Sequence, residues 1–194
     1  MTRVEKIVQK LHSKLASKNI LEVACGCAEF SIAASEFAES VYAIDLDDIR
    51  LLPEAKAIDN LHFQIMDATA MTYQDKTFDT VVMYNAIGHL AEIVGDVLAE
   101  CLRVLKYDGS IYIVSSFKMD KSFIDSELVP YLNLKQSLID FEIGEDKPFM
   151  YVKVMHKKPL FELILDAESR AGTARGSRTT DDAERILVKD YPGS

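Results

Sequence analysis

The feature that most constrains the fold is an alternation of short apolar runs, typical of buried strands, with stretches of helical periodicity. The five strand-like runs are residues 19–24, 41–46, 61–67, 78–85 and 110–117. Strands that alternate with helices favour a mostly parallel sheet covered on both faces. Two more runs within residues 139–158, joined by a Gly-Glu-Asp-Lys-Pro turn, predict an antiparallel pair at one edge.

The helical stretches are expected at residues 1–18, 28–40, 52–58, 90–105 and 121–138, the last interrupted at Pro130. The clearest periodicity belongs to residues 90–105, where apolar side chains recur every three or four positions. Cys101 falls within that stripe, so we expect it in the core and not at a reactive site. Gly109 is expected to end this helix as a C-cap residue.

The first helix carries lysines and an arginine opposite an apolar face. Two interpretations are open: a solvated surface, which is favoured, or a lid that attracts an anionic small molecule.

The chain is expected to contain one domain, residues 1–165, which begins with this helix. The hydrophobic content of the whole chain is 48%, which is enough for a sizeable core. Residues 166–194 form a C-terminal extension, small and polar at first, whose apolar cluster at 186–188 needs a surface. That surface could be the mouth of a substrate site or a second copy of the chain, and a homodimer is somewhat favoured.

The net charge of −9 disfavours nucleic acid as a partner. No apolar run is long enough to predict a membrane span. Three cysteines and no signal-peptide pattern at the start favour a cytoplasmic location.

Polar or special residues stand where four of the predicted strands end. The loop Cys25-Gly26-Cys27 follows the first strand, Asp45 follows Gly26 by 19 residues, and Asp67 follows Asp45 by 22. An acidic residue about twenty positions after a glycine turn is where a ribose diol is bound in nucleotide-binding sheets. The cysteine pair is too close for an easy disulfide, and no second pair completes a metal site. A ligand-cradling turn is therefore favoured, with a turn that only lets helix and strand pack closely as the alternative.

A resemblance to the class I S-adenosylmethionine-dependent methyltransferase family extends over roughly residues 20–157 and is carried by ILEVACGCAEFS, VYAIDLD, LHFQIMDATAMTYQDKTFDTVVMYNAIGHL and LRVLKYDGSIYIVSS. The resemblance implies a doubly wound, mostly parallel sheet of seven strands in the order 3-2-1-4-5-7-6, with the last strand antiparallel. It also implies S-adenosylmethionine as the cofactor, while the lack of a second Cys pair or nearby His predicts no metal ion.

The family pattern implies a role for each residue at the strand ends. Glu22 would support the ammonium end of the cofactor, and the backbone of the loop would face its methionine portion. Asp45 would bind the ribose hydroxyls. The remaining assignments are Leu46 packing on adenine, Asp67 accepting from the adenine amino group, the Ala68 N–H meeting a ring nitrogen, and Asn85 at the methionine end.

This chain has Ala24 and Ala28 where the family usually has glycine. A methyl group there crowds a backbone that approaches the ligand, so weaker cofactor binding is expected. Restoring glycine is expected to tighten binding and to lower thermal stability slightly.

His89 is the best candidate for a general base, because it follows the fourth strand and imidazole is suited to proton transfer near neutral pH. The alternative is that it starts or caps the following helix. Tyr84 and Asn85 could orient the acceptor or the cofactor, or only satisfy the backbone at a strand end.

The sequence thus predicts methyl transfer from S-adenosylmethionine to a small-molecule acceptor. A non-catalytic protein that binds S-adenosylmethionine or S-adenosylhomocysteine, or a scaffold with a degenerate glycine loop, is the alternative. A nicotinamide dehydrogenase fits poorly, since it does not require Asp67 and needs more loop glycines.

Overall fold

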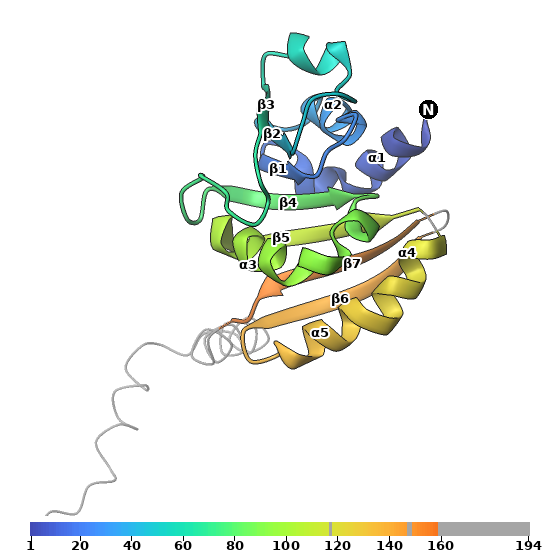
Figure 1. The fold of residues 1–194 in the computed structure, drawn as a ribbon. Helices are drawn as coiled ribbons and strands as arrows, with labels where there is room; N and C mark the ends of the chain where they lie inside the picture. The colour runs from blue at the N-terminus through green and yellow to red at the C-terminus, as the bar shows by residue number, and fades with distance from the viewer. Residues whose placement is uncertain (117, 147–148, 159–194) are drawn as a thin grey trace, which may run out of the picture. The chain divides into compact units, whose positions relative to one another are not determined.

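The computed structural model describes residues 1–116, 118–146 and 149–158, and Met1–Lys157 form one compact unit around a seven-stranded sheet (Figure 1). The strand order is β3-β2-β1-β4-β5-β7-β6. Neighbours from β3 to β5 are parallel, and β7 is antiparallel to both of its neighbours. The strands are β1 (Asn19–Val23), β2 (Ser40–Asp45), β3 (Leu61–Ile65), β4 (Phe78–Tyr84), β5 (Leu105–Ser115), β6 (Ile139–Asp146) and β7 (Phe149–His156). The predicted fold class is confirmed.

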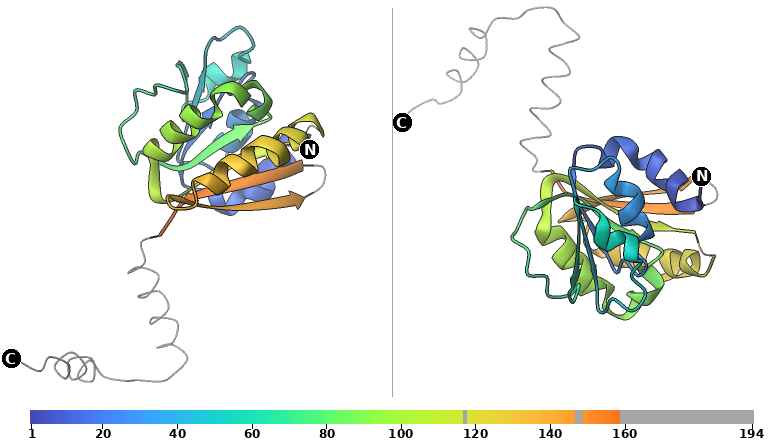
Figure 2. Two further views of the ribbon diagram at one scale, coloured as in Figure 1. Left: turned by 60° about the horizontal axis from the view of Figure 1, so that its bottom comes forward. Right: turned by 90° about the horizontal axis from the view of Figure 1, so that it is seen from above.

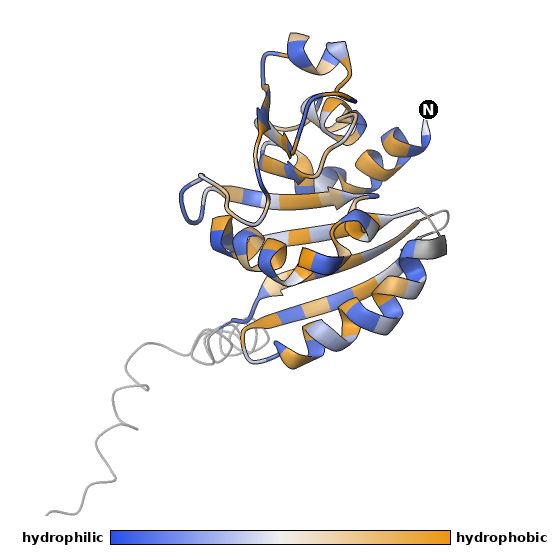
Figure 3. Cartoon of the chain, in the orientation of Figure 1, coloured by the Kyte–Doolittle hydropathy of each residue, from blue (hydrophilic) through white to orange (hydrophobic). Residues whose placement is uncertain are grey.

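Alternate residues of the central strands enter two hydrophobic cores on opposite faces of the sheet. Leu21 and Val81 pack with α3 and α5, whereas Ile20 and Val82 pack with α1 and α2. The α-helices are α1 (Arg3–Leu15), α2 (Glu29–Ser35), α3 (Val94–Val104), α4 (Lys118–Phe123) and α5 (Val129–Leu134). Figure 2 shows the sheet between the two groups of helices, and Figure 3 shows the hydrophobic residues concentrated on the central strands. A strand covered on both faces must be apolar at successive positions, which explains the unbroken runs in the sequence.

The helix α1 begins with a capping box, in which Thr2 accepts from the Glu5 N–H and the Glu5 carboxylate accepts from the Thr2 N–H. Its apolar face is buried as predicted. The basic side chains of the opposite face are exposed, in agreement with a solvated surface. Arg3 donates to the Ser116 hydroxyl, which brings the start of α1 to the end of β5.

The long helix predicted from Leu90 is partly wrong. The chain first forms two 3₁₀ turns, η2 (Ile87–His89) and η3 (Ala91–Ile93), and α3 begins only at Val94. Cys101 is fully buried within α3, as predicted. An apolar spacing of three is common to 3₁₀ and α-helices, so the sequence pattern does not separate them.

The prediction that Gly109 is a C-cap is also wrong. The helix α3 ends at Val104, and Gly109 lies inside β5, where the pairing with β4 is irregular between Phe78 and Thr80. A Cβ atom on Gly109 would lie 2.7 Å from the carbonyl oxygen of Asp79. Glycine is therefore needed for a close approach of two strands and not for a helix end.

The helix predicted over residues 121–138 is divided into α4, a π-helical turn at Ile124–Leu128 and α5. The Val129 N–H donates to the Ile124 carbonyl, five residues back. Pro130, in the first turn of α5, has no N–H to donate. The wider π turn lets the helical path continue through the proline, where an interruption was expected.

The helix after β1 is also shorter than predicted, since α2 ends at Ser35. None of the helices in the described ranges is long and apolar enough to cross a membrane. The predicted extension at residues 166–194, with its apolar cluster and its role in a homodimer, lies outside the described residues.

Candidate functional site

A cavity of about 400 Å³ lies at the carboxyl ends of β1, β2, β3 and β4. Carboxyl ends of parallel strands form the usual ligand-binding edge of such sheets. Eleven of the twelve predicted site residues line the cavity: Ala24, Cys25, Gly26, Cys27, Asp45, Leu46, Asp67, Ala68, Tyr84, Asn85 and His89. The twelfth, Glu22, is buried and does not line the cavity.

The loop between β1 and α2 is tied to the end of β2 by two hydrogen bonds. The Cys25 N–H donates to the Ile44 carbonyl at 3.0 Å, and the Gly26 N–H donates to Asp45 Oδ2 at 2.7 Å. Asp45 Oδ1 accepts from the Leu46 N–H at 2.8 Å. Each carboxylate oxygen has two lone pairs, so Asp45 can support the loop and still accept from two hydroxyl groups of a ligand.

Both alanines in this loop have left-handed backbone conformations. The φ angle is 54° at Ala24 and 61° at Ala28, and Gly26 has φ 54°. An L-residue in this region costs about 1–2 kcal/mol, which glycine avoids. The positions therefore need the backbone that glycine provides in related loops. The expectation that glycine lowers stability must be revised, because relief of this strain opposes the entropy of the unfolded chain.

We expect Ala24→Gly to raise the free energy of unfolding by up to about 1 kcal/mol, since strain relief exceeds the gain in unfolded-state entropy. The same change at Ala28 should be close to neutral, because that fully buried methyl group contributes about 0.8 kcal/mol of burial. Only Ala24 lines the cavity, so only Ala24→Gly should tighten binding of S-adenosylhomocysteine.

Urea unfolding and calorimetry measure both effects. Ala33→Gly, inside α2, is the matched control and should lose about 1 kcal/mol of stability. A loss of stability in Ala24→Gly equal to that of the control would rule out strain at this position.

Glu22 is 1% exposed, and both the N–H and the hydroxyl of Ser31 donate to its Oε2 atom. Ser31 is the third residue of α2, so a side chain from β1 satisfies a backbone donor in the first turn of that helix. Burial raises the pKa of Glu22 to about 8, and the bonds from Ser31 only partly oppose this effect. Glu22 thus holds the start of α2 in this structure and does not line the cavity.

The segment after β3 presents Asp67 and Ala68 to the cavity. The N–H and hydroxyl of Thr69 donate to Asp67 Oδ1 at 2.8 and 2.7 Å, and these bonds lower the pKa of the Asp67 carboxyl. The carboxylate is exposed and retains Oδ2 for a ligand. No described residue accepts a hydrogen bond from the Ala68 N–H. An acceptor and a donor are therefore adjacent, as the edge of an adenine ring requires.

Three predicted residues, Tyr84, Asn85 and His89, lie at the end of β4 or shortly after it. Asn85 Oδ1 accepts from the N–H and hydroxyl of Ser116 at 2.8 and 3.1 Å, which ties the end of β4 to the end of β5. Burial raises the pKa of the Tyr84 phenol, so Tyr84 suits hydrogen bonding better than proton abstraction. His89 is exposed at the cavity and lies in η2, so it does not begin α3.

The three cysteines are free, and Cys25 and Cys27 both line the cavity. Burial raises the pKa of the Cys25 thiol above its usual range, which disfavours the thiolate. No group of three His, Cys, Asp or Glu side chains within the described residues is placed to hold a metal ion.

Sequence reasoning missed Arg50 and Glu29, which also line the cavity. A Cβ atom built on Gly26 would lie 3.3 Å from Arg50 Nη2, so the guanidinium group lies directly over the loop. Arg50 could have been identified from the sequence, because it is a cation that closely follows Asp45, Asp47 and Asp48 in the loop after β2.

Known proteins resemble this chain in sequence and in fold. The family model described as "Methyltransferase domain" matches residues 21–113. The chain is similar to the "Uncharacterized methyltransferase YcgJ" of Bacillus subtilis (strain 168), with 24% identity over 123 residues. That alignment covers 61% of this chain and 48% of the relative, so the chain spans about half the length of this relative.

Solved structures share the fold. The crystal structure of PH0226 protein from Pyrococcus horikoshii OT3 has a TM-score of 0.63 and 21% identity, and the alignment covers 81% of this chain and 92% of that one. The "DhpI-SAH complex structure" has a TM-score of 0.62 and 16% identity over 78% of this chain and 83% of that one. At these identities the likeness establishes the fold alone.

Proposed function

We propose that the chain is a class I S-adenosylmethionine-dependent methyltransferase and that it transfers a methyl group to a small-molecule acceptor. The methyltransferase family model that matches residues 21–113 and the similar proteins support this proposal. One observation carries the proposal: the β1–α2 loop, Asp45 and Asp67 with Ala68 all line one cavity. A nicotinamide dehydrogenase does not require Asp67 and needs more glycines in the loop than this chain has.

The residues present fit this cofactor. The cavity of about 400 Å³ falls within the usual range of about 300–1,000 Å³ for small-molecule sites. Asp45 would accept from the ribose hydroxyls, and Asp67 with the Ala68 N–H would face the adenine edge. Leu46, which is 70% exposed, gains an apolar partner if adenine packs on it. When bound, S-adenosylmethionine supplies a methyl group activated by a sulfonium.

The chain itself must position the acceptor and manage its proton. Displacement at a methyl group requires an in-line approach, so positioning supplies much of the rate. The Asn85 amide nitrogen and the Tyr84 hydroxyl are the donors nearest the end of β4, where the acceptor or the cofactor's amino acid portion would be oriented. His89 would take a proton from an acceptor that arrives protonated.

The acidic chain supports a small molecule over a nucleic acid as the acceptor. The free cysteines support a cytoplasmic setting.

Calorimetry of the full chain with S-adenosylhomocysteine and with NAD tests the cofactor assignment, and only the first should bind. A labelled methyl group should then be transferred to a compound in a pool of small metabolites. His89→Gln should lower kcat while leaving the Kd for S-adenosylhomocysteine unchanged. Binding without transfer to any compound would favour the non-catalytic binding protein, and binding of neither ligand would favour the scaffold with a degenerate glycine loop.

A further inference from the structure

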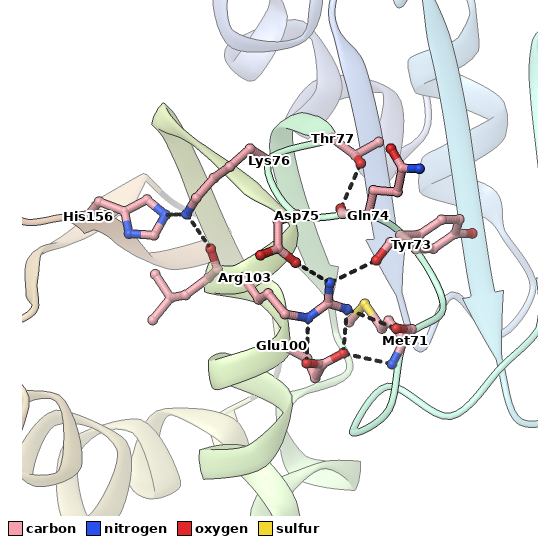
Figure 4. Close-up of polar contacts among 10 residues, drawn as sticks. Met71, Tyr73, Gln74, Asp75, Lys76, Thr77, Glu100, Arg103 and His156 are labelled. Carbon is pink, nitrogen blue, oxygen red and sulfur yellow. Dashed lines mark hydrogen bonds and ion pairs between the residues drawn. The ribbon is translucent and has the colours of Figure 1, made fainter.

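A cluster of polar contacts around Arg103 joins α3 to the connection between β3 and β4 (Figure 4). Arg103 makes five hydrogen bonds, which use all the donors of its guanidinium group. Two go to the Glu100 carboxylate, one to Asp75 Oδ1, and one each to the carbonyl oxygens of Met71 and Tyr73. We call these residues the Arg103 network.

The network holds the backbone of the connection at several points. The Met71 N–H donates to Glu100 Oε2 at 2.8 Å, while Arg103 Nη2 donates to the Met71 carbonyl at 2.8 Å. Farther along, the Lys76 N–H donates to the Arg103 carbonyl at 3.0 Å. Met71 is also buried in the hydrophobic core. The position of Met71 is therefore fixed by the last turns of α3.

This position matters because Met71 lies only four residues after Asp67. The intervening turn is compact, with the Thr69 N–H bonded to the Asp67 side chain and the Ala70 N–H bonded to the Asp67 carbonyl. A displacement of Met71 would therefore pass to Asp67 and Ala68, which line the cavity.

The pair at the centre of the network stays charged near neutral pH. The Glu100 carboxylate raises the pKa of Arg103 further above its usual range, and Arg103 lowers the pKa of Glu100. Because the Glu100 and Arg103 side chains remain 19% and 31% exposed, the ion pair itself adds little stability. A lysine could replace the charge of Arg103, but only a planar group with five donors can also bond to the Met71 and Tyr73 carbonyl groups in the β3–β4 connection.

We propose that Arg103 and Glu100 are positioning residues, which hold Asp67 and Ala68 in place for the adenine end of the cofactor. This proposal rests on the proposed function. The turns that precede α3 contribute His89, Leu90 and Ile93 to the same cavity. One helical segment thus lines the cavity where it begins and, where it ends, holds the connection that follows Asp67 and Ala68.

The test measures the Kd of the full chain for S-adenosylhomocysteine by calorimetry. Arg103→Lys keeps the positive charge and loses the planar guanidinium group with its five donors. It should weaken binding about tenfold, because the β3–β4 connection is then misplaced. Arg103→Met should weaken it at least as much. The KM for S-adenosylmethionine should rise while kcat is unchanged. Val97→Ala, a core change in the same helix, controls for loss of stability and should bind nearly as well as the original chain.

A double-mutant cycle separates positioning from a merely structural role. In an Asp67→Asn background, Arg103→Lys should weaken binding less than about threefold, because the group it positions is already altered. Additive effects, or a Kd for Arg103→Lys within twofold of the original, would overturn the proposal. If the unaltered chain does not bind S-adenosylhomocysteine at all, the proposed function fails instead, whatever the variants do.

Discussion

Asp45→Ala is expected to weaken binding of S-adenosylhomocysteine by about 1.5–3 kcal/mol, or roughly 10- to 150-fold. Two interactions are lost together. The carboxylate no longer accepts from the ribose hydroxyls, and the Gly26 N–H loses the oxygen that holds the loop at 2.7 Å. Hydrogen bonds to charged acceptors are the stronger class, so the loss should stand above the usual effect of a surface substitution.

Asp45→Asn separates the two interactions, because its carbonyl oxygen can still accept from Gly26 while the charge is gone. Its affinity should fall between those of the original chain and Asp45→Ala. Asp47→Ala is the matched control, since Asp47 lies two residues away and does not line the cavity. Calorimetry at constant ionic strength gives each Kd. An Asp45→Ala variant that binds as tightly as the Asp47→Ala control would exclude the ribose assignment.

The strands and the residues at their ends could be predicted from the sequence, because both depend on local pattern. Apolar runs mark the strands, and an acidic residue directly after a parallel strand must lie at the carboxyl edge of the sheet. Asp45 and Asp67 were found in this way, and the structure brings both to one cavity. The strand order came from the resemblance to a family and not from the pattern.

The conformation of the β1–α2 loop could not be predicted, because contacts between distant segments decide it. The left-handed φ of Ala24 occurs next to the bond from Cys25 to the end of β2, about twenty residues away in the sequence. A glycine in a sequence indicates that a positive φ angle is possible at that position, whereas an alanine gives no such indication.

The Arg103 network was missed for the same reason. Its bonds from Arg103 to the β3–β4 connection span 28 to 32 residues. In the sequence, Glu100 and Arg103 form an ordinary pair three residues apart on a helix surface. Only the fold shows that backbone carbonyl groups lie within reach of the same guanidinium group.

The titration of Glu22 should make the stability of the protein depend on pH above the acid range. Its pKa is about 8 in the folded state and near the ordinary value of 4.5 in the unfolded chain, because burial favours the neutral carboxyl. Between these values the folded state retains a proton that the unfolded chain has released. Stability from this group is therefore complete below about pH 4.5 and is lost as the pH rises towards 8, by up to about 1.4 kcal/mol per pH unit.

Glu22→Gln removes this titration and keeps a carbonyl oxygen that can accept from Ser31. We expect the free energy of unfolding of this variant to rise relative to that of the original chain as the pH increases from 5 to 8. Urea unfolding at four pH values across this range measures the difference. Glu29→Gln, which removes an exposed carboxylate from the first turn of α2, controls for the change in net charge. If the free energies of unfolding of Glu22→Gln and the original chain changed with pH in parallel, Glu22 would be ionised in the folded protein. The Ser31 N–H and hydroxyl, at the start of α2, would then donate to a charged carboxylate.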